Sequence, residues 1–255
     1  MSASVRGPFT GVLNIVRFNW PFFVAAELLI VAAVVGATML SPSRIAFLLA
    51  LVAVGAMFGI ALSLVVSHII YDRSDLYRLY WLPRALRQLE IHDAVFCQTG
   101  FDESSALFRG ALPAARWTLL DHYDPQRMTE ASIQRARRVC PPPAESVVAA
   151  YDAWSTPRAS ADVVFGILAV HELRSDAERE AWFAEARRTV RPLGRVVIVE
   201  HVRDLANAIA FGPGALHFHA METWRVNWTR AGLRAVDQFR VTPWVRVFVL
   251  EAERP

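Results

Sequence analysis

The chain has 255 residues, of which 54% are hydrophobic and only 20% are charged. A soluble chain of this length is usually more polar, so part of this one is expected to meet lipid, and disorder is excluded as its main state. All 27 positive residues are arginines, which excludes a lysine Schiff base, a pyridoxal-phosphate anchor and a phosphate-loop lysine. The net charge of +3 is too small to predict nucleic-acid binding.

Two long apolar runs near the N-terminus predict transmembrane helices. Residues 20–40 contain one charge, Glu27, and residues 45–70 contain no Asp, Glu or Arg. Each run is long enough to cross a hydrocarbon core of about 30 Å. Four residues that include Pro42 separate the runs, so we expect a tight antiparallel hairpin. A cleaved signal peptide is the alternative for the first run, but the second run follows it at once.

The arginines around the hairpin predict its orientation. The connecting loop has only Arg44, whereas six arginines flank the outer ends of the two runs: Arg6, Arg17, Arg73, Arg78, Arg84 and Arg87. Because positive charge is retained on the cytoplasmic side of a membrane, we expect two spans with both termini in the cytoplasm.

Two further features of this region concern the membrane surface and its interior. Residues 71–90 contain three tyrosines and a tryptophan, a pattern typical of an amphipathic segment with an interfacial aromatic belt.

Glu27 would lie within the first span, where an ionised group is costly. We interpret it as protonated or paired with a neighbour, and a functional proton or ion site is the alternative.

Residues 91–255 contain short apolar runs that alternate with amphipathic helical patterns. Strands are expected at 93–97, 117–120, 146–150, 162–169 and 194–199, and helices at 102–112, 126–139 and 175–190. This alternation predicts a parallel sheet with helices on both faces. The chain then continues with a helix and an antiparallel pair of strands, at 221–231, 236–241 and 245–252.

The predicted fold class is therefore α/β. A Rossmann-like sheet, parallel with a C-terminal antiparallel hairpin, is preceded by a two-helix transmembrane hairpin. Three parts are expected: the hairpin at 1–70, an amphipathic linker at 71–90 and the α/β domain at 91–255.

Three segments of the α/β region carry a more specific signal. They are YDAWSTP at 151–157, ADVVFGILAVHEL at 161–173 and RRTVRPLGRVVIVE at 187–200. In this order they resemble the class I S-adenosylmethionine-dependent methyltransferases, in particular those of type 11. Leu193 takes the place of a glycine in the turn that precedes the family's fifth strand. The resemblance covers residues 91–255 and implies a methyltransferase with S-adenosylmethionine (SAM) as its cofactor.

The resemblance also implies a cofactor site at the carboxyl ends of the strands. Asp121, at the end of the second strand, would accept hydrogen bonds from both ribose hydroxyls. Asp152 would contact the adenine amino group, and Ala153 would pack on the adenine ring. Gly166 and His171, near the end of the fourth strand, would face the same crevice.

The loop after the first strand departs from the family pattern Asp-x-Gly-x-Gly-x-Gly. In the run AVFCQTG at 94–100, Cys97, Thr99 and Gly100 stand at cofactor-binding positions, and only Gly100 keeps a family glycine. Glycines serve there because the backbone turns tightly and approaches the ligand. Phe96 and Gln98 add bulk instead. The acid that the family has at position 94 is missing, and three nearby acids are candidates to replace it: Asp93, Asp102 and Glu103.

The histidines are the candidate catalytic residues. Residues 212–219 are expected to form a lid over the acceptor, and His171, His217 and His219 are candidate general bases for a hydroxyl acceptor, with His201 as a further candidate. His217 and His219 on one strand, followed by Glu222, match no zinc motif, so we expect no metal.

Other sites are not predicted. Two cysteines, Cys97 and Cys140, are too few for a disulfide framework or a cysteine metal site, and we interpret both as free thiols. Neither a Gly-x-Ser-x-Gly elbow nor a Gly-x-Gly-x-x-Gly loop occurs, which disfavours hydrolase chemistry and nicotinamide binding.

The sequence therefore favours a membrane-anchored SAM-dependent methyltransferase with a lipophilic acceptor, such as a quinone, an isoprenoid or a lipid headgroup. The hairpin would hold the pocket at the bilayer, where the acceptor is concentrated. The alternative is an inactive methyltransferase fold that serves as a binding or scaffold module in a membrane complex, because its first loop has lost its glycines. The expected partners are the bilayer and the acceptor, without nucleic acid; a membrane protein complex and a homo-oligomer both stay open.

Overall fold

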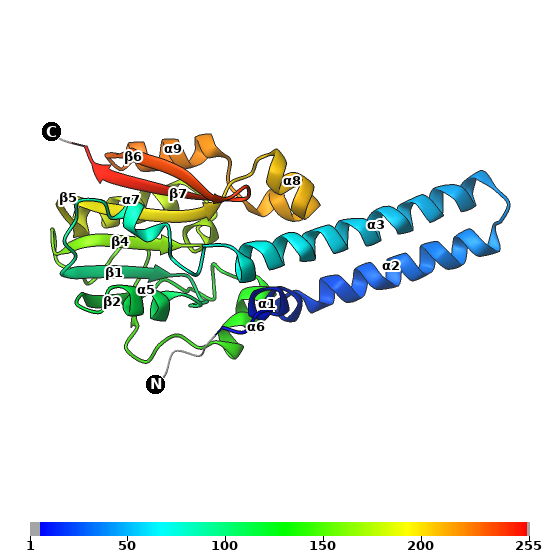
Figure 1. Cartoon of the computed structure of the whole chain (residues 1–255), viewed down its shortest axis with the longest axis horizontal. Coiled ribbons are helices and arrows are strands. Elements are labelled where there is room, and N and C mark those ends of the chain that lie inside the picture. The colour runs from blue at the N-terminus through cyan, green and yellow to red at the C-terminus, as the bar shows by residue number, and fades with distance from the viewer. Residues whose placement is uncertain (1–5, 254–255) are drawn as a thin grey trace.

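The computed structural model describes residues 6–253 of the chain. An α/β unit lies at one end, and two long antiparallel helices project from it (Figure 1). The projecting helices are α2 (Trp20–Met39) and α3 (Arg44–His68), and α3 continues into the π-helical turn η1 (Ile69–Arg73). The Ser43 side chain caps α3 by accepting a hydrogen bond from the backbone N–H of Ala46.

The two long helices are apolar on all sides, and most of their surface is exposed. Between them only a thin seam is buried, around Ile30, Ala33 and Ala53. Phe47 is 69% exposed, and Glu27 also lies on the exposed surface. Both helices are long and apolar enough to cross a membrane, by length and composition alone.

The α/β unit is built on one seven-stranded sheet. Its strands are β1 (Asp93–Gln98), β2 (Arg116–Asp121), β3 (Val147–Val148), β4 (Ala161–Ile167), β5 (Val190–His201), β6 (Leu233–Thr242) and β7 (Val245–Ala252). The order is β3-β2-β1-β4-β5-β7-β6. The first five are parallel, and β7 pairs antiparallel with both β5 and β6. The predicted parallel sheet with a C-terminal antiparallel hairpin is thus confirmed.

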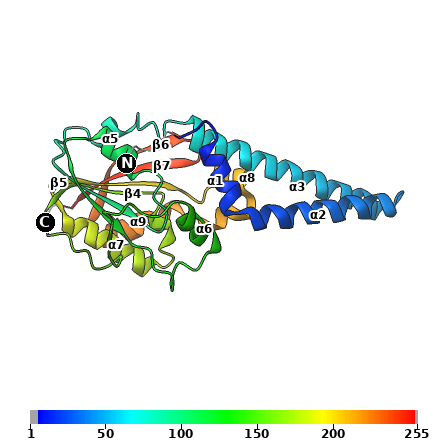
Figure 2. The same ribbon diagram turned by 90° about the horizontal axis from the view of Figure 1, so that it is seen from below.

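Helices cover both faces of the sheet (Figure 2). On one face α7 (Asp176–Thr189) and α9 (Met221–Arg230) bury large aromatic side chains, which include Trp182 and Trp224. The other face packs against α5 (Ser105–Ala111), mainly through Phe108. These aromatic side chains are among the largest that are fully buried between the sheet and its helices.

The segment at 71–90 differs from the prediction. It contains only a short helix, α4 (Leu82–Ala85), and most of its apolar side chains pack against the sheet beside Phe108. Trp81 is buried and donates its indole N–H to the Leu76 carbonyl, while Tyr80 is exposed. The prediction of an interfacial aromatic belt is therefore wrong for most of this segment. Its apolar side chains pack against the face of the sheet that α7 and α9 do not cover.

A further helix, α1 (Thr10–Phe18), crosses the carboxyl ends of the strands. Two of its backbone N–H groups, those of Gly11 and Val12, donate to the Asp72 carboxylate in η1 at 2.6 and 3.1 Å. A Cβ at position 11 would lie 2.3 Å from the Tyr71 Cβ, so only glycine permits this close approach. The N-terminal segment is consequently fastened to the base of the hairpin.

Some predicted elements have different bounds. The second predicted helix is shorter, α6 (Ala131–Val139), and the third strand has only two residues. His217 and His219 do not lie on a strand: His217 ends the 3-10 helix η3 (Gly212–His217), which follows α8 (Leu205–Phe211). A 3-10 turn directs neighbouring side chains differently from a strand, and the two imidazoles accordingly have different surroundings.

Candidate active site at the base of the hairpin

A cavity of about 210 Å³ lies where α1 crosses the carboxyl ends of β1 and β4. This is the edge where open α/β sheets bind ligands. Its volume is below the ~300 Å³ at which drug-sized ligand pockets begin. Side chains that can form hydrogen bonds reach it from α1, η1, the loops after β1 and β4, and the end of β5: Asn14, Tyr71, Tyr77, Glu103, His171, Glu172 and His201.

Glu103 is the carboxylate on the β1 side of the cavity. It accepts hydrogen bonds from the Tyr77 hydroxyl at 2.7 Å and the Asn14 amide at 3.0 Å, and Arg6 lies 2.8 Å away as an ion pair. Burial and the Glu103 carboxylate hold the pKa of Tyr77 well above its ordinary value. Tyr77 therefore stays protonated and continues to donate.

The two other acids considered as replacements lie elsewhere. Asp93 is at the opposite end of β1, where it pairs with Arg116 and Arg191. Asp102 caps α5 by accepting from the backbone N–H groups at 104 and 105. Of the three candidates, only Glu103 lines the cavity.

His201 and Tyr71 form a directional hydrogen-bonded pair. The Asn207 amide nitrogen donates to two backbone carbonyls, so its oxygen accepts from Nδ1 of His201 at 3.1 Å. The His201 Nε2 is then the unprotonated nitrogen, and it accepts the Tyr71 hydroxyl at 2.9 Å. Burial lowers the pKa of His201 to about 4, so the ring is neutral near pH 7. A neutral imidazole thus stands behind a hydroxyl that faces the cavity.

His171 has the opposite charge state. Its Nδ1 lies 2.7 Å from Oε2 of Glu200, a fully buried carboxylate that also accepts from the backbone N–H groups of Ala169 and His171. Burial alone would lower the pKa of His171, but Glu200 and Glu172 outweigh it and raise this pKa well above the usual value. Without a further ligand, His171 is therefore a cation rather than a base.

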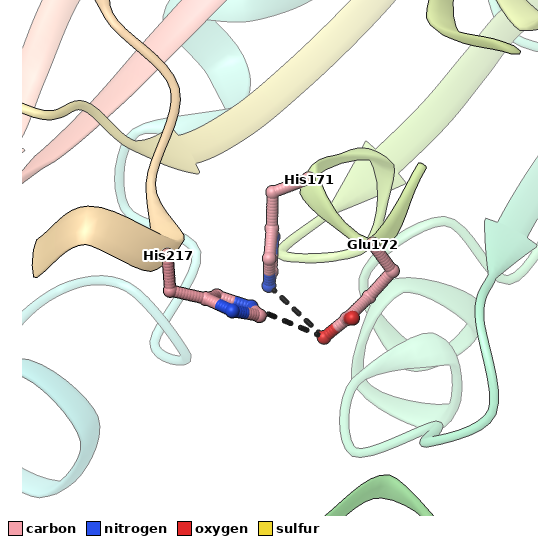
Figure 3. A group of neighbouring side chains, drawn as sticks. All are labelled: His171, Glu172 and His217. Carbon is pink, nitrogen blue, oxygen red and sulfur yellow. Dashed lines mark ion pairs between the residues drawn. The ribbon is translucent and has the colours of Figure 1, made fainter. Parts of the chain in front are cut away.

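The structure separates the two lid histidines. His217 does not line the cavity, but its Nε2 lies 3.6 Å from Oε1 of Glu172, which does (Figure 3). The Nε2 of His219 lies 3.0 Å from an Arg179 nitrogen and 3.2 Å from the His171 carbonyl oxygen. Burial lowers the pKa of His219 to about 4. His171 and His217 are thus brought together, and His219 is not part of the cavity wall.

Asp121 stands at the end of β2, as expected, but both of its oxygens have partners. Oδ2 accepts from Arg137 at 2.6 Å, and Oδ1 accepts from the Tyr123 backbone N–H at 3.1 Å. The Arg137 guanidinium also stacks 4.5 Å from the Tyr123 ring centre. Asp121 is only 1% exposed and does not line the cavity.

The remaining cofactor candidates are spread over four environments. Thr99 lines the cavity and donates to the Ala169 carbonyl at 2.7 Å. Gly100 has a left-handed φ of 94°, and a Cβ there would lie 2.7 Å from the Tyr123 ring. Cys97 and Gly166 pack in the core. Two others lie on an exposed turn outside the cavity, namely Asp152 and Ala153.

The bulky residues of the first strand do not obstruct the cavity. Phe96 packs against Phe108 with ring centres 5.4 Å apart, and Gln98 is buried without lining the cavity. The space beyond Gly100 is filled instead by Tyr123 and Ile133.

These contacts test whether SAM fits. Glu103, Glu172 and Thr99 all line the cavity, and the two carboxylates suit a ligand end that carries positive charge. The adenosine end would need the Asp121 carboxylate, which Arg137 holds. The carboxylates of the cavity therefore suit the positively charged methionine end of SAM. The adenosine end does not fit this arrangement, because Arg137 holds Asp121 and because Tyr123 and Ile133 fill the space beyond Gly100.

Comparisons with known proteins identify the fold. No protein-family model matches the sequence, and no curated protein matches it. A SAM-dependent methyltransferase from Clostridium acetobutylicum is similar in structure, with TM-score 0.50, 7% identity, and coverage of 71% of this chain and 92% of that chain. A SAM-dependent methyltransferase from Aquifex aeolicus has TM-score 0.50, 13% identity, and coverage of 69% and 90%. The chain thus has the fold of the SAM-dependent methyltransferases.

Several site residues were not candidates from the sequence. Glu172 and Glu200 lie inside the segments that carry the family resemblance, so their positions beside His171 and His201 were available as a signal. Tyr71 was assigned to the membrane interface. For Arg137, one of several arginines on α6, no sequence signal indicated the pairing with the end of β2.

Proposed function

We propose that this protein is a membrane-anchored, SAM-dependent methyltransferase that acts on a lipophilic acceptor. The position of the cavity supports this proposal most directly. It lies at the ligand-binding edge of a methyltransferase-type sheet, and its wall includes η1, the continuation of a long apolar helix. When bound, SAM would supply a methyl group activated by the positive sulfur.

The exposed apolar surfaces support the membrane anchor. Besides α2 and α3, the helix α8 and the turn η3 expose Leu205, Ile209 and Leu216. Helix α8 packs against α3 where the hairpin leaves the α/β unit (Figure 1). Apolar side chains around the base of a hairpin suit contact with the lipid surface. The cavity would then face the bilayer from the cytoplasmic side, where a lipophilic acceptor is concentrated.

The chain's own groups would prepare the acceptor. An acceptor hydroxyl would donate to the Tyr71 oxygen, whose own hydroxyl donates to Nε2 of His201, and this chain of hydrogen bonds would orient the acceptor oxygen. Helix α1 would exclude water from the cavity, and the Glu103 carboxylate would orient the bound molecules.

A second candidate is a binding or scaffold module without methyl transfer. The ion pair between Asp121 and Arg137 favours it, because a permanent pair would make the ribose carboxylate a structural group. The loss of glycines before Gly100 points in the same direction.

Calorimetric titration of the full-length protein with SAM distinguishes the two candidates. In the enzyme, D121N weakens SAM binding at least tenfold, whereas R137Q tightens it about tenfold, because ~1.4 kcal/mol of competing interaction is removed. R138Q is the matched control, since Arg138 is the exposed neighbour on the same helix. No binding at millimolar SAM in any variant would refute the enzyme and leave the module.

A further inference from the structure

Three side chains that can bind metals converge at the rim of the cavity (Figure 3). His171 and Glu172 belong to η2 (Val170–Glu172), just after β4, and His217 ends η3. Their side chains are 12%, 14% and 26% exposed. His171 and Glu172 line the cavity, so the cluster is sheltered but accessible from it.

The spacing of the three groups suits a shared ion better than hydrogen bonds. Oε1 of Glu172 lies 3.3 Å from Nε2 of His171 and 3.6 Å from Nε2 of His217. The second distance is too long for a hydrogen bond. Two ligands that each bind one tetrahedral zinc ion at about 2.1 Å lie about 3.4 Å from each other. Both observed distances are close to that separation.

A carboxylate also stands behind each imidazole. Oε2 of Glu200 lies 2.7 Å from Nδ1 of His171, and Oε1 of Glu130 lies 3.4 Å from Nδ1 of His217. An Arg174 nitrogen also contacts the His217 ring, 3.2 Å from Nδ1 and 3.5 Å from Nε2, and it would have to move away when an ion binds. Histidines that bind metals commonly donate their second ring N–H to a carboxylate, which directs the other nitrogen toward the ion. Glu200 is itself held by two backbone N–H groups, so His171 is oriented in advance.

The charges of the cluster also favour a cation. Glu130, Glu172 and Glu200 face the two imidazoles, while a nitrogen of Arg174 lies 3.2 Å from Nδ1 of His217. With neutral imidazoles this arrangement has a net charge of about −2, which a divalent cation would neutralise.

We propose that His171, Glu172 and His217 bind one divalent transition-metal ion, such as Zn²⁺. Two histidines and one carboxylate form a ligand set that leaves coordination positions open in catalytic zinc and iron(II) sites. Here the open positions would face the cavity and take an oxygen donor, such as a hydroxyl or carbonyl group of the bound molecule. This proposal differs from the expectation of no metal. It uses Glu172, which also lines the cavity considered for SAM, so Zn²⁺ binding is measured without SAM.

The test uses the full-length protein in detergent, treated with a chelator and dialysed. Titration with Zn²⁺ alone is expected to give one ion per chain, and Co²⁺ is expected to produce visible absorption bands of a nitrogen and oxygen site. H217A should weaken Zn²⁺ binding at least 100-fold, and E200Q about 10–100-fold, because Glu200 orients a ligand. Mg²⁺, which prefers oxygen ligands, should not compete.

H92A is the matched control, because His92 is exposed at the opposite end of the sheet. It should bind Zn²⁺ as the wild type does. Melting curves without Zn²⁺ verify that each variant folds. Addition of Zn²⁺ should raise the melting temperature only in proteins that keep His171, Glu172 and His217. Absence of Zn²⁺ and Co²⁺ binding by the wild type, or equal affinities of H217A and H92A, would overturn the metal site. SAM binding is titrated separately, so failure of either proposal is distinguishable.

Discussion

The carboxyl edge of the sheet has two sides that differ in the use of their charged groups. At β2, Asp121 is engaged by Arg137 and Tyr123, and the space beyond Gly100 is filled. At β4 and β5, polar side chains line the cavity, and His171, Glu172 and His217 converge beside it. The first side is closed by contacts within the protein, whereas the second side keeps an open cavity lined by polar groups.

The charge states sharpen this difference. Asp121 has its counterion beside it, so the β2 side is neutral as a unit. On the other side, His201 is neutral and its neighbour His171 is charged, although both are imidazoles near the end of β5. Groups of one type that are held in different protonation states are a common feature of functional sites.

The largest expected effect concerns the pH dependence of stability, through His201. Its pKa is 6.5 in the unfolded chain and about 4 in the folded protein, because it is buried. Between these two pH values, His201 is protonated in the unfolded state but not in the folded state. Stability is complete above pH 6.5 and falls by up to about 3 kcal/mol as the pH drops to 4.

Comparison of the wild type with H201Q measures this contribution. Thermal unfolding between pH 4 and 7 should show a steeper loss of stability for the wild type than for H201Q. Parallel curves for the two proteins would show that His201 is protonated as readily in the folded state as in the unfolded state.

A smaller effect is expected from D121A, on the β2 side. The substitution removes the carboxylate that pairs with the partly buried Arg137 guanidinium. It should lower the free energy of unfolding by about 2 kcal/mol. This value is below that of a fully buried pair, because the Arg137 side chain is 24% exposed. Chemical denaturation measures it, and the double variant D121A/R137A should recover part of the loss. If D121A is as stable as the wild type, the β2 side is not held by this pair.

The smallest effect is expected from a substitution that lies on neither side of the carboxyl edge, and it serves as a reference for the two larger effects. Leu193, at the start of β5, has a left-handed φ of 69° and is 66% exposed. L193G should stabilise the fold by about 1 kcal/mol, because glycine adopts this conformation without steric cost. L193A keeps the Cβ and should gain nothing in the same unfolding experiment. An equal gain in both variants would exclude backbone strain as the cause.

Much of the fold was predictable because its elements have local signals. The parallel strands are short apolar runs bounded by turns, and the antiparallel pair β6–β7 follows from two runs joined by a Pro-containing turn. The apolar length of α2 and α3 was equally evident. The prediction for 71–90 was wrong in part. A segment rich in aromatic residues has the same composition whether it lies at a lipid surface or packs against a sheet, and here it packs against the sheet.

The candidate site was predictable only in fragments. Thr99, Gly100 and Asp121 lie at the expected strand ends, since a resemblance in strand order also places the residues that end each strand. The family resemblance did not predict that α1 lies over these strand ends. It also did not predict the contact between Arg137 and Asp121, which depends on the position of α6.

The alternation of strands and helices, the antiparallel end of the sheet and the two long apolar helices could be predicted from the chain alone, since each depends on residues close together in it. Which carboxylates meet which cations and histidines became known only from the folded structure. His171 and His217, or Tyr71 and His201, are far apart in the chain, and their contact is set by the packing of whole elements. Charge state and binding capacity depend on those contacts, because burial and neighbouring charges can shift the pKa of one residue type by several units.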